Sequence, residues 1–299
     1  MENLPNEIIL QQLEKMSHQD LLNTCKTNKR INQICKDNED YLYKKLIKRE
    51  FFDNINPKFL YNLFLFNKKK GVDLFDKSKH FNLYKSAILN NNINQISYLY
   101  NIGVSINAVD NKGMTPLMYS LRNYGTPEII NKILDLNPYI NAVDISGMTP
   151  LIFSLVYSTP EIINRILDLQ VDINVVNKRG NTPLMFALQT STQQIINRIL
   201  DLNPDINVVD KHGDTALMFA LQFSTPEIIN RILDLNFDIN VVDKYGDTPL
   251  TIALKYSTPE IINRILDLKP KFNAKDSLKI YKDNPNTSQD IINRLNQKQ

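Results

Sequence analysis

Apolar and polar positions follow a helical rhythm in the string TPEIINRILDL at residues 159–169. Its apolar positions are Ile162, Ile163, Ile166, Leu167 and Leu169. Their spacing predicts one apolar stripe along a helix, with Asn164, Arg165 and Asp168 facing away from it. Glu161 falls in the first turn, where the positive end of the helix dipole favours a carboxylate.

This string recurs with few changes along the second half of the chain. It starts at Thr126, Thr159, Thr192, Thr225 and Thr258. A fixed spacing of 33 residues is typical of solenoid proteins, in which each unit stacks on the next. Where Asn203-Pro204 follows the string, we expect the helix to stop, because Asn tolerates the left-handed conformation and Pro cannot continue a helix.

A second recurring string places a turn and another helix in each repeat. Its glycines are Gly113, Gly147, Gly180, Gly213 and Gly246, five of the eight in the chain. A slot that always holds Gly predicts a positive φ angle, and the Asp or Asn three residues earlier is typical of turns. The Thr-Pro pair that follows most of these glycines predicts a short helix, because Thr can cap it and Pro suits its first position.

The combined pattern Asp-x-x-Gly-x-Thr-Pro-Leu resembles the ankyrin repeat over residues 82–296. The resemblance implies an α-solenoid with short hairpin turns, about five full repeats and degenerate caps at both ends. The family has a His after Thr-Pro-Leu that ties neighbouring turns together. This chain has Met118, Ile152, Met185, Met218 and Thr251 there, which leaves open how its repeats are joined.

The turn tips and the first helices hold the candidate target-binding residues. At the tips these are Lys178, Arg179, Lys211, His212, Lys244 and Tyr245. On the first helices they are Tyr119, Phe153, Phe186 and Phe219, which by resemblance face the concave groove of the array. Exposed aromatic side chains in a row would suit a protein interface. The alternative is that these rings pack between repeats as part of the core.

The first 50 residues carry three short helical patterns rich in large apolar groups. About 45 residues without a disulfide or a metal are too few to form a stable hydrophobic core alone, so we expect another surface to cover part of their apolar side chains. Leu4-Pro5-Asn6-Glu7-Ile8, Asp20-Leu21-Leu22 and Asn28-Lys29-Arg30 together resemble an F-box. That resemblance implies three helices that dock onto the Skp adaptor of cullin-based ubiquitin ligases. The docking residues it implies are Leu4, Pro5, Ile8, Leu13 and Leu21, with Tyr43 in place of the family Trp.

Residues 51–81 join the two modules and are dense in aromatic residues. Such a composition is unlike a flexible linker, so we expect helices that pack the F-box against the first repeat. The alternative for residues 1–50 is an ordinary helical cap on the solenoid.

The remaining chemistry indicates binding rather than catalysis. The net charge is only +3, and the three His residues stand in unrelated settings. We expect no catalytic residue, metal, cofactor, nucleic-acid partner or membrane partner. The pair Cys25 and Cys35 is too small for a disulfide framework, and no signal peptide is visible, so we expect a cytoplasmic protein.

We therefore expect the substrate-recognition subunit of a Skp-cullin-F-box ubiquitin ligase. The F-box would dock the Skp adaptor and the cullin core, and the ankyrin array would bind a target protein. Chains that join these two modules resemble proteins of giant DNA viruses and amoebae, which would place the targets in a host cytoplasm or nucleus. The alternative is an ankyrin scaffold that sequesters a host or cellular protein without ubiquitination.

Overall fold

The computed structural model describes residues 80–101, 104–235, 237–284 and 288–297, together with Gln12 and Gln33. The expected F-box and most of the connector lie outside these residues, as do Cys25 and Cys35. The described helices begin with α6 (His80–Leu89), α7 (Ile93–Asn101), α8 (Pro116–Tyr119), the π-helix η2 (Ser120–Tyr124), α9 (Pro127–Asp135), α10 (Pro150–Tyr157) and α11 (Pro160–Leu167). They continue with α12 (Pro183–Thr190), α13 (Gln193–Asp201), α14 (Ala216–Phe223), α15 (Pro226–Leu233), α16 (Pro249–Tyr256), α17 (Pro259–Asp267), α18 (Ala274–Lys282) and α19 (Gln289–Asn296).

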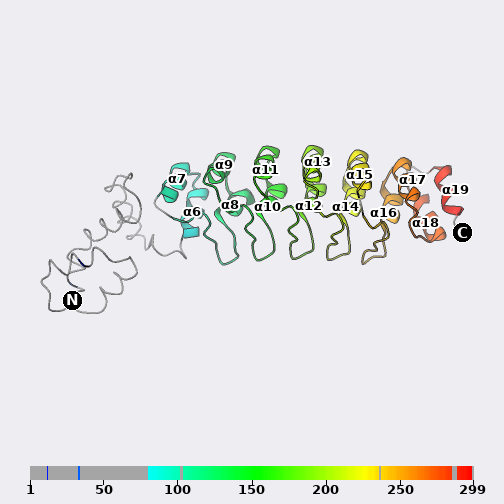
Figure 1. Ribbon diagram of the computed structural model, residues 1–299, viewed down its shortest axis with the longest axis horizontal. Coiled ribbons are helices and arrows are strands. Elements are labelled where there is room, and N and C mark those ends of the chain that lie inside the picture. Colours follow the sequence, from blue (N-terminus) through cyan, green and yellow to red (C-terminus); the bar gives the residue numbers. More distant parts are fainter. Residues whose placement is uncertain are drawn as a thin grey trace.

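The helices stand in one row of antiparallel pairs (Figure 1). The first helices α10, α12, α14 and α16 pack against one another in sequence order, and so do the second helices α11, α13, α15 and α17. Loops project on the side away from the second helices (Figure 1). The prediction of an all-α solenoid is confirmed, with one isolated bridge between Val209 and Thr215 as the described β-type pairing.

The first helices α8, α10, α12 and α16 start where the Thr-Pro signal predicts them, and α14 starts after Thr215 without the Pro. In α12 the Thr182 hydroxyl accepts a hydrogen bond from the Met185 N–H at 3.3 Å, and Pro183 is the first helical residue. The Met185 sulfur in turn accepts the Thr182 N–H at 3.5 Å. The thioether therefore completes the cap at the position where the family has His.

Each second helix buries the apolar stripe that its sequence predicts, with one correction. Ile162, Ile163, Ile166 and Leu167 are buried in α11, but Leu169 is 38% exposed. The helix ends at Leu167, so Leu169 leaves the helical register and turns toward solvent. Glu161 lies in the first turn, where hydrogen bonds from the Thr159 side chain and from its own backbone lower the pKa of its carboxyl.

The second helices end in two ways that alternate along the row. Helices α11 and α15 end at a Leu, and the other second helices of the full repeats end one residue later. Helices α9, α13 and α17 run on to an Asp and are followed by residues with positive φ: Asn137 (50°), Asn203 (53°) and Lys269 (54°). A Pro follows each of these three residues. The expected left-handed stop at Asn203 is therefore confirmed.

The turn tips close on themselves and then bond to the next tip. In one of them the Asp144 carboxylate accepts the N–H groups of Ser146 and Met148, both at 2.8 Å. The Ser146 carbonyl accepts the N–H of Lys178 in the next repeat at 2.9 Å. Gly147 has a φ of 79°, which confirms the conformation predicted for the glycine slot.

Two side-chain ladders join neighbouring repeats. They show how the repeats are connected although the family His is missing. In the first, Arg198 Nη1 donates to Asn164 O at 3.0 Å and Oδ1 at 2.7 Å, while Nη2 pairs with Asp168. In the second, Asn141 Oδ1 accepts the Asp172 N–H at 2.8 Å. The arginines of the first ladder are Arg165, Arg198, Arg231, Arg264 and Arg294.

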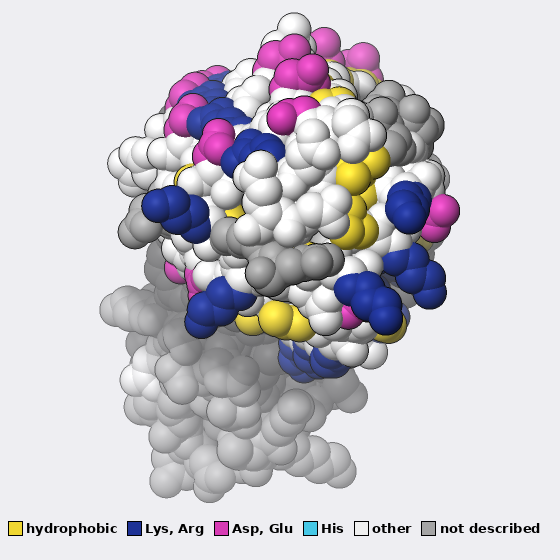
Figure 2. All heavy atoms as spheres, turned by 90° about the vertical axis from the view of Figure 1, so that its right-hand side faces the viewer, with side chains coloured by type: hydrophobic (Ala, Val, Ile, Leu, Met, Phe, Trp, Pro, Cys, Tyr) yellow, Lys and Arg dark blue, Asp and Glu magenta, His cyan; other side chains and the backbone are white. Residues whose placement is uncertain are grey.

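Helix pairs of irregular sequence end the described array. At its start, α6 and α7 bury Tyr84, whose hydroxyl donates to the Val104 carbonyl at 2.9 Å. At its end, α18 and α19 bury Tyr281, Ile291 and Leu295. Figure 2 looks onto this end and shows basic side chains around a short apolar strip. A polar outer face of this kind suits the last unit of a solenoid.

Candidate binding groove

A hollow of about 990 Å³ lies between the turn tips and the first helices of neighbouring repeats. Its lining comes from residues 146–148, 177–189, 210–223 and Lys244. The stacking of α10, α12, α14 and α16 brings these stretches side by side, although they are far apart in the sequence. The hollow therefore forms a groove that crosses several repeats.

The tips give the groove a cationic rim. Its cations are Lys178, Arg179, Lys211 and Lys244, all exposed. Among the ion pairs that the structure describes, none involves these four side chains. His212 also lines the groove and stacks on the Tyr245 ring, with centroids 6.2 Å apart. The predicted tip residues other than Tyr245 are therefore gathered along the groove.

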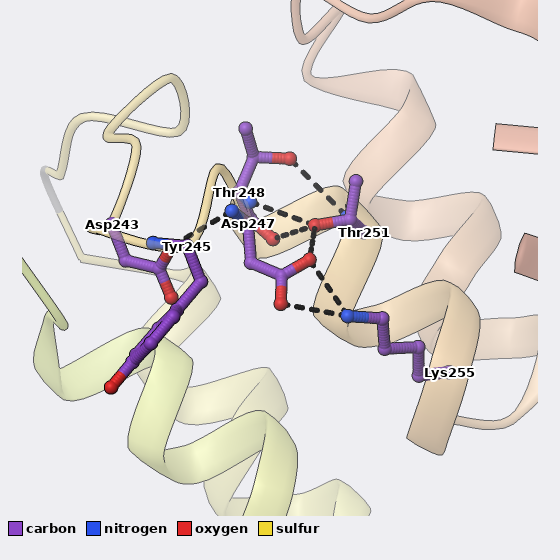
Figure 3. Close-up of polar contacts among 6 residues, drawn as sticks. All are labelled: Asp243, Tyr245, Asp247, Thr248, Thr251 and Lys255. Carbon is purple, nitrogen blue, oxygen red and sulfur yellow. Dashed lines mark hydrogen bonds and ion pairs between the residues drawn. The ribbon is translucent and has the colours of Figure 1, made fainter. Parts of the chain in front are cut away.

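The floor of the groove contains one carboxylate that differs from its counterpart in the next repeat. Asp214 is half-buried, and burial, with Asp210 and Asp243 nearby, raises the pKa of its carboxyl. Asp247 holds the same slot 33 residues later, and Lys255 Nζ contacts both of its carboxylate oxygens at 2.7 Å (Figure 3). The Thr251 hydroxyl donates to the same carboxylate at 3.0 Å (Figure 3).

The repeat of Asp214 lacks both of these side chains. Met218 stands at the position of Thr251, and Gln222 at that of Lys255. Gln222 and Asp214 both line the groove. The chain neutralises the Asp247 carboxylate with its own Lys255. The equivalent carboxylate one repeat earlier, that of Asp214, is presented to the groove.

The expected row of exposed aromatic side chains is wrong for two of its members. Phe153 is 4% exposed and Phe219 is 7% exposed, because both belong to the hydrophobic core. Tyr119 and Phe186 are only partly buried. Phe186 and the edge of Phe219 line the groove, whereas Tyr119 packs against Phe81 with ring centroids 5.7 Å apart. Binding of a target by any of them stays a prediction.

A second aromatic row, which sequence reasoning missed, is the exposed one. It comprises Tyr124, Tyr157, Phe223 and Tyr256, which are 46%, 40%, 56% and 64% exposed. Three of them stand four residues after the position of the first row, one helical turn further along. The 33-residue spacing of aromatic residues there was the signal that could have found them. Phe223 lines the groove.

The structure thus brings five of the six predicted tip residues together with Phe186 and Phe219, while Tyr245 lies outside the groove lining. Tyr119 and Phe153 are not part of the groove lining, and the predicted adaptor-binding residues lie outside the described part of the chain. Among the described residues, no group of three or more His, Cys, Asp and Glu side chains could hold a metal ion. No described helix has both the length and the apolar character needed to cross a bilayer.

Two parts of the chain match models of known protein families. A family model described as ankyrin repeats (3 copies) matches residues 122–210 and 191–276, which together span more than half of the chain. A model described as F-box-like matches residues 1–49. No curated protein matches the chain.

Proposed function

The chain belongs to the ankyrin-repeat proteins and carries an F-box-like domain, and from this premise we propose that it is the substrate-recognition subunit of a Skp-cullin-F-box ubiquitin ligase. Both modules are protein-interaction modules, so the chain is an interaction adaptor. The observation that carries the finer assignment is the F-box-like match over residues 1–49, on the same chain as a groove lined by exposed cations.

The proposed mechanism needs no chemistry from the chain itself. Residues 1–49 hold the Skp adaptor in the cytoplasm, and the groove holds a target protein on the same polypeptide. Tethering turns the encounter of target and ligase into an intramolecular event with a high effective concentration. Ubiquitin transfer is then performed by the other subunits of the ligase.

The test of this assignment is adaptor binding by the full chain. We expect a purified Skp adaptor to bind in calorimetry, and Leu4→Ala with Pro5→Ala to weaken binding at least about 30-fold, because apolar anchors dominate such interfaces. Circular dichroism should show that the double variant keeps its helical repeats. The matched control is Lys211→Gln in the groove, which should bind the adaptor like the unaltered chain. Full adaptor binding by the double variant would overturn the assignment.

A scaffold without ubiquitination is the second candidate. The observation in its favour is that the described lining of the groove, between residues 146 and 244, comes from the ankyrin repeats. A scaffold would leave the amount of its bound target unchanged when the proteasome is blocked. A ligase subunit would let that amount rise.

A further inference from the structure

We propose that the groove binds an extended acidic segment of the target, wound as a polyproline II helix with a carboxylate at every third residue. The inference rests on the proposed function, since it names the chemistry of the segment that the groove would take. Three features of the groove carry it: the charge of its rim, the spacing of that charge and the apolar wall opposite.

Within the described part of the chain, the rim charge has no ion-pair partner. Every arginine of the inter-repeat ladder from Arg165 to Arg294 has an aspartate partner, whereas the described structure gives none to Lys178, Arg179, Lys211 or Lys244. These four cations line the groove together with two carboxylates among the described lining residues, Asp210 and Asp214. A groove edged by one sign of charge attracts the opposite sign.

One of the two groove carboxylates is already engaged in the turn. Asp210 Oδ1 accepts the N–H of His212 at 2.7 Å and the N–H of Asp214 at 3.0 Å. Asp214 lies on the floor, where it would repel an acidic side chain. The acidic residues of the bound segment should therefore point to the rim, and the residues between them should be uncharged.

The spacing of the rim selects the conformation of the segment. Lys178, Lys211 and Lys244 occupy one slot of the repeat, two residues before Gly180, Gly213 and Gly246. Their first helices α12, α14 and α16 pack in direct contact, which sets successive repeats about 8–10 Å apart.

A polyproline II helix matches this spacing. It rises about 3.1 Å per residue with three residues per turn, so equivalent side chains recur about every 9 Å. In a β-strand, side chains on one face recur about every 6.6 Å and would miss alternate lysines. The tip before Lys178 carries Ile145 in this slot, and the unit after Lys244 lacks the Gly-x-Thr-Pro string of a tip. Three carboxylates should therefore suffice.

The wall of the groove opposite the rim accepts the residues between the carboxylates. Phe186 is half-buried there and Phe223 is 56% exposed. Aromatic side chains that line a groove are the surfaces on which polyproline II segments dock in general. Proline or alanine between the acidic residues would therefore bury apolar area on these rings.

The test uses two fluorescein-labelled peptides of equal composition and the full chain. The first peptide is (Glu-Pro-Ala) repeated five times, and the second has its five Glu residues together, followed by the Pro and Ala residues. We expect fluorescence anisotropy to show that the first peptide binds at least about tenfold more tightly, because only its carboxylates have the same spacing as the rim lysines. Equal binding of both peptides, or no binding of either, would overturn the proposal.

Variants of the rim and the floor make the assignment specific. Lys211→Gln should weaken binding of the repeating peptide about threefold, as expected for one exposed charge pair, and the triple Lys178, Lys211 and Lys244 to Gln variant about 30-fold. Asp214→Asn should tighten binding, and Lys112→Gln, at a tip outside the groove lining, should leave it unchanged. Lys112→Gln weakening binding as much as Lys211→Gln would indicate a general attraction to anions and overturn the proposal.

The same variants separate this inference from the proposed function. The triple variant should still bind the Skp adaptor, because the substitutions lie far in sequence from residues 1–49. Peptide binding that fails while adaptor binding persists would remove the acidic segment and leave the ligase assignment standing. A single-stranded polyuridylate RNA that binds more tightly than either peptide would also overturn the proposal.

Discussion

At the scale of single residues, two constraints favour glycine in the turn slot: a positive φ angle and the close approach of the next tip. The structure shows that they do not always act together. Gly180 has a φ of 83°, and a Cβ placed on it would lie 2.6 Å from Asp210 Cα in the next tip. Gly246 has nearly the same φ, 84°, but a Cβ there would meet nothing within 4 Å. The first glycine is needed for conformation and for close approach, and the second for conformation alone.

Alanine substitutions should therefore cost different amounts at these two glycines. Gly246→Ala should lower the free energy of unfolding by about 1–2 kcal/mol, the cost of a left-handed residue with a side chain. Gly180→Ala should lower it by about 1–3 kcal/mol more, because the neighbouring tip must shift. Urea denaturation followed by circular dichroism would measure both losses. Equal losses would contradict the close approach of the tips.

At the scale of elements, the second helices show how a stop signal depends on one side chain. Three of them end before a left-handed residue that precedes a Pro, and that residue is Asn137, Asn203 or Lys269. Asn visits the left-handed region more readily than other residues with a side chain, since its amide can bond locally. Lys269 has no such compensation, so the end of α17 is the least favourable of the three.

Replacing Lys269 with Asn should stabilise the protein. We expect the free energy of unfolding to rise by about 0.5–1 kcal/mol, a part of the left-handed cost of about 1–2 kcal/mol. The reverse exchange at the equivalent position, Asn203→Lys, should lower it by a similar amount. Thermal unfolding of the two variants would measure both changes, and a loss of stability in Lys269→Asn would show that the lysine has another role.

Elements of this kind are also where prediction from sequence succeeds and where it stops. The helix starts at Thr182-Pro183 and the stop at Asn203 depend on local backbone chemistry, which a single repeat contains. The partner of Arg198 depends on which residues lie across a repeat boundary, and the polar face of one helix does not reveal it. The burial of Phe153 has the same origin, because neighbouring first helices decide which side of the ring is covered.

At the scale of the whole molecule, contacts between adjacent repeats hold the array together, and the same contacts recur at successive repeat boundaries. From the repeat of α10 and α11 to that of α16 and α17, each repeat adds one arginine fork and one tip-to-tip bond to the repeat before it. Stability in such an array is close to a sum of repeat terms and neighbour terms. A change at one boundary should therefore weaken the coupling between the two sides.

Removing one arginine fork should show this coupling. Arg198→Ala should lower the free energy of unfolding by about 1 kcal/mol, a modest value because Asp168 is largely exposed and its pairing is screened. Arg198→Lys should restore less than half of the loss, because an ammonium cannot bind as a fork. Lys132→Ala, in the same slot of the first full repeat, is the control and should have little effect. Chemical denaturation would measure all three.

Because the same residue types form the contacts at successive repeat boundaries, these contacts also have a genetic consequence. If residues 192–224 were deleted, Ser191 would be followed by Thr225, and Arg231 would meet Asn164 and Asp168 in place of Asn197 and Asp201. The new partners are the same residue types in the same slots. Unequal exchange between the near-identical coding segments could therefore shorten or lengthen the array by whole units while every junction stayed complementary. The number of units that a lineage inherits can change in one genetic step, without passing through a chain that fails to fold.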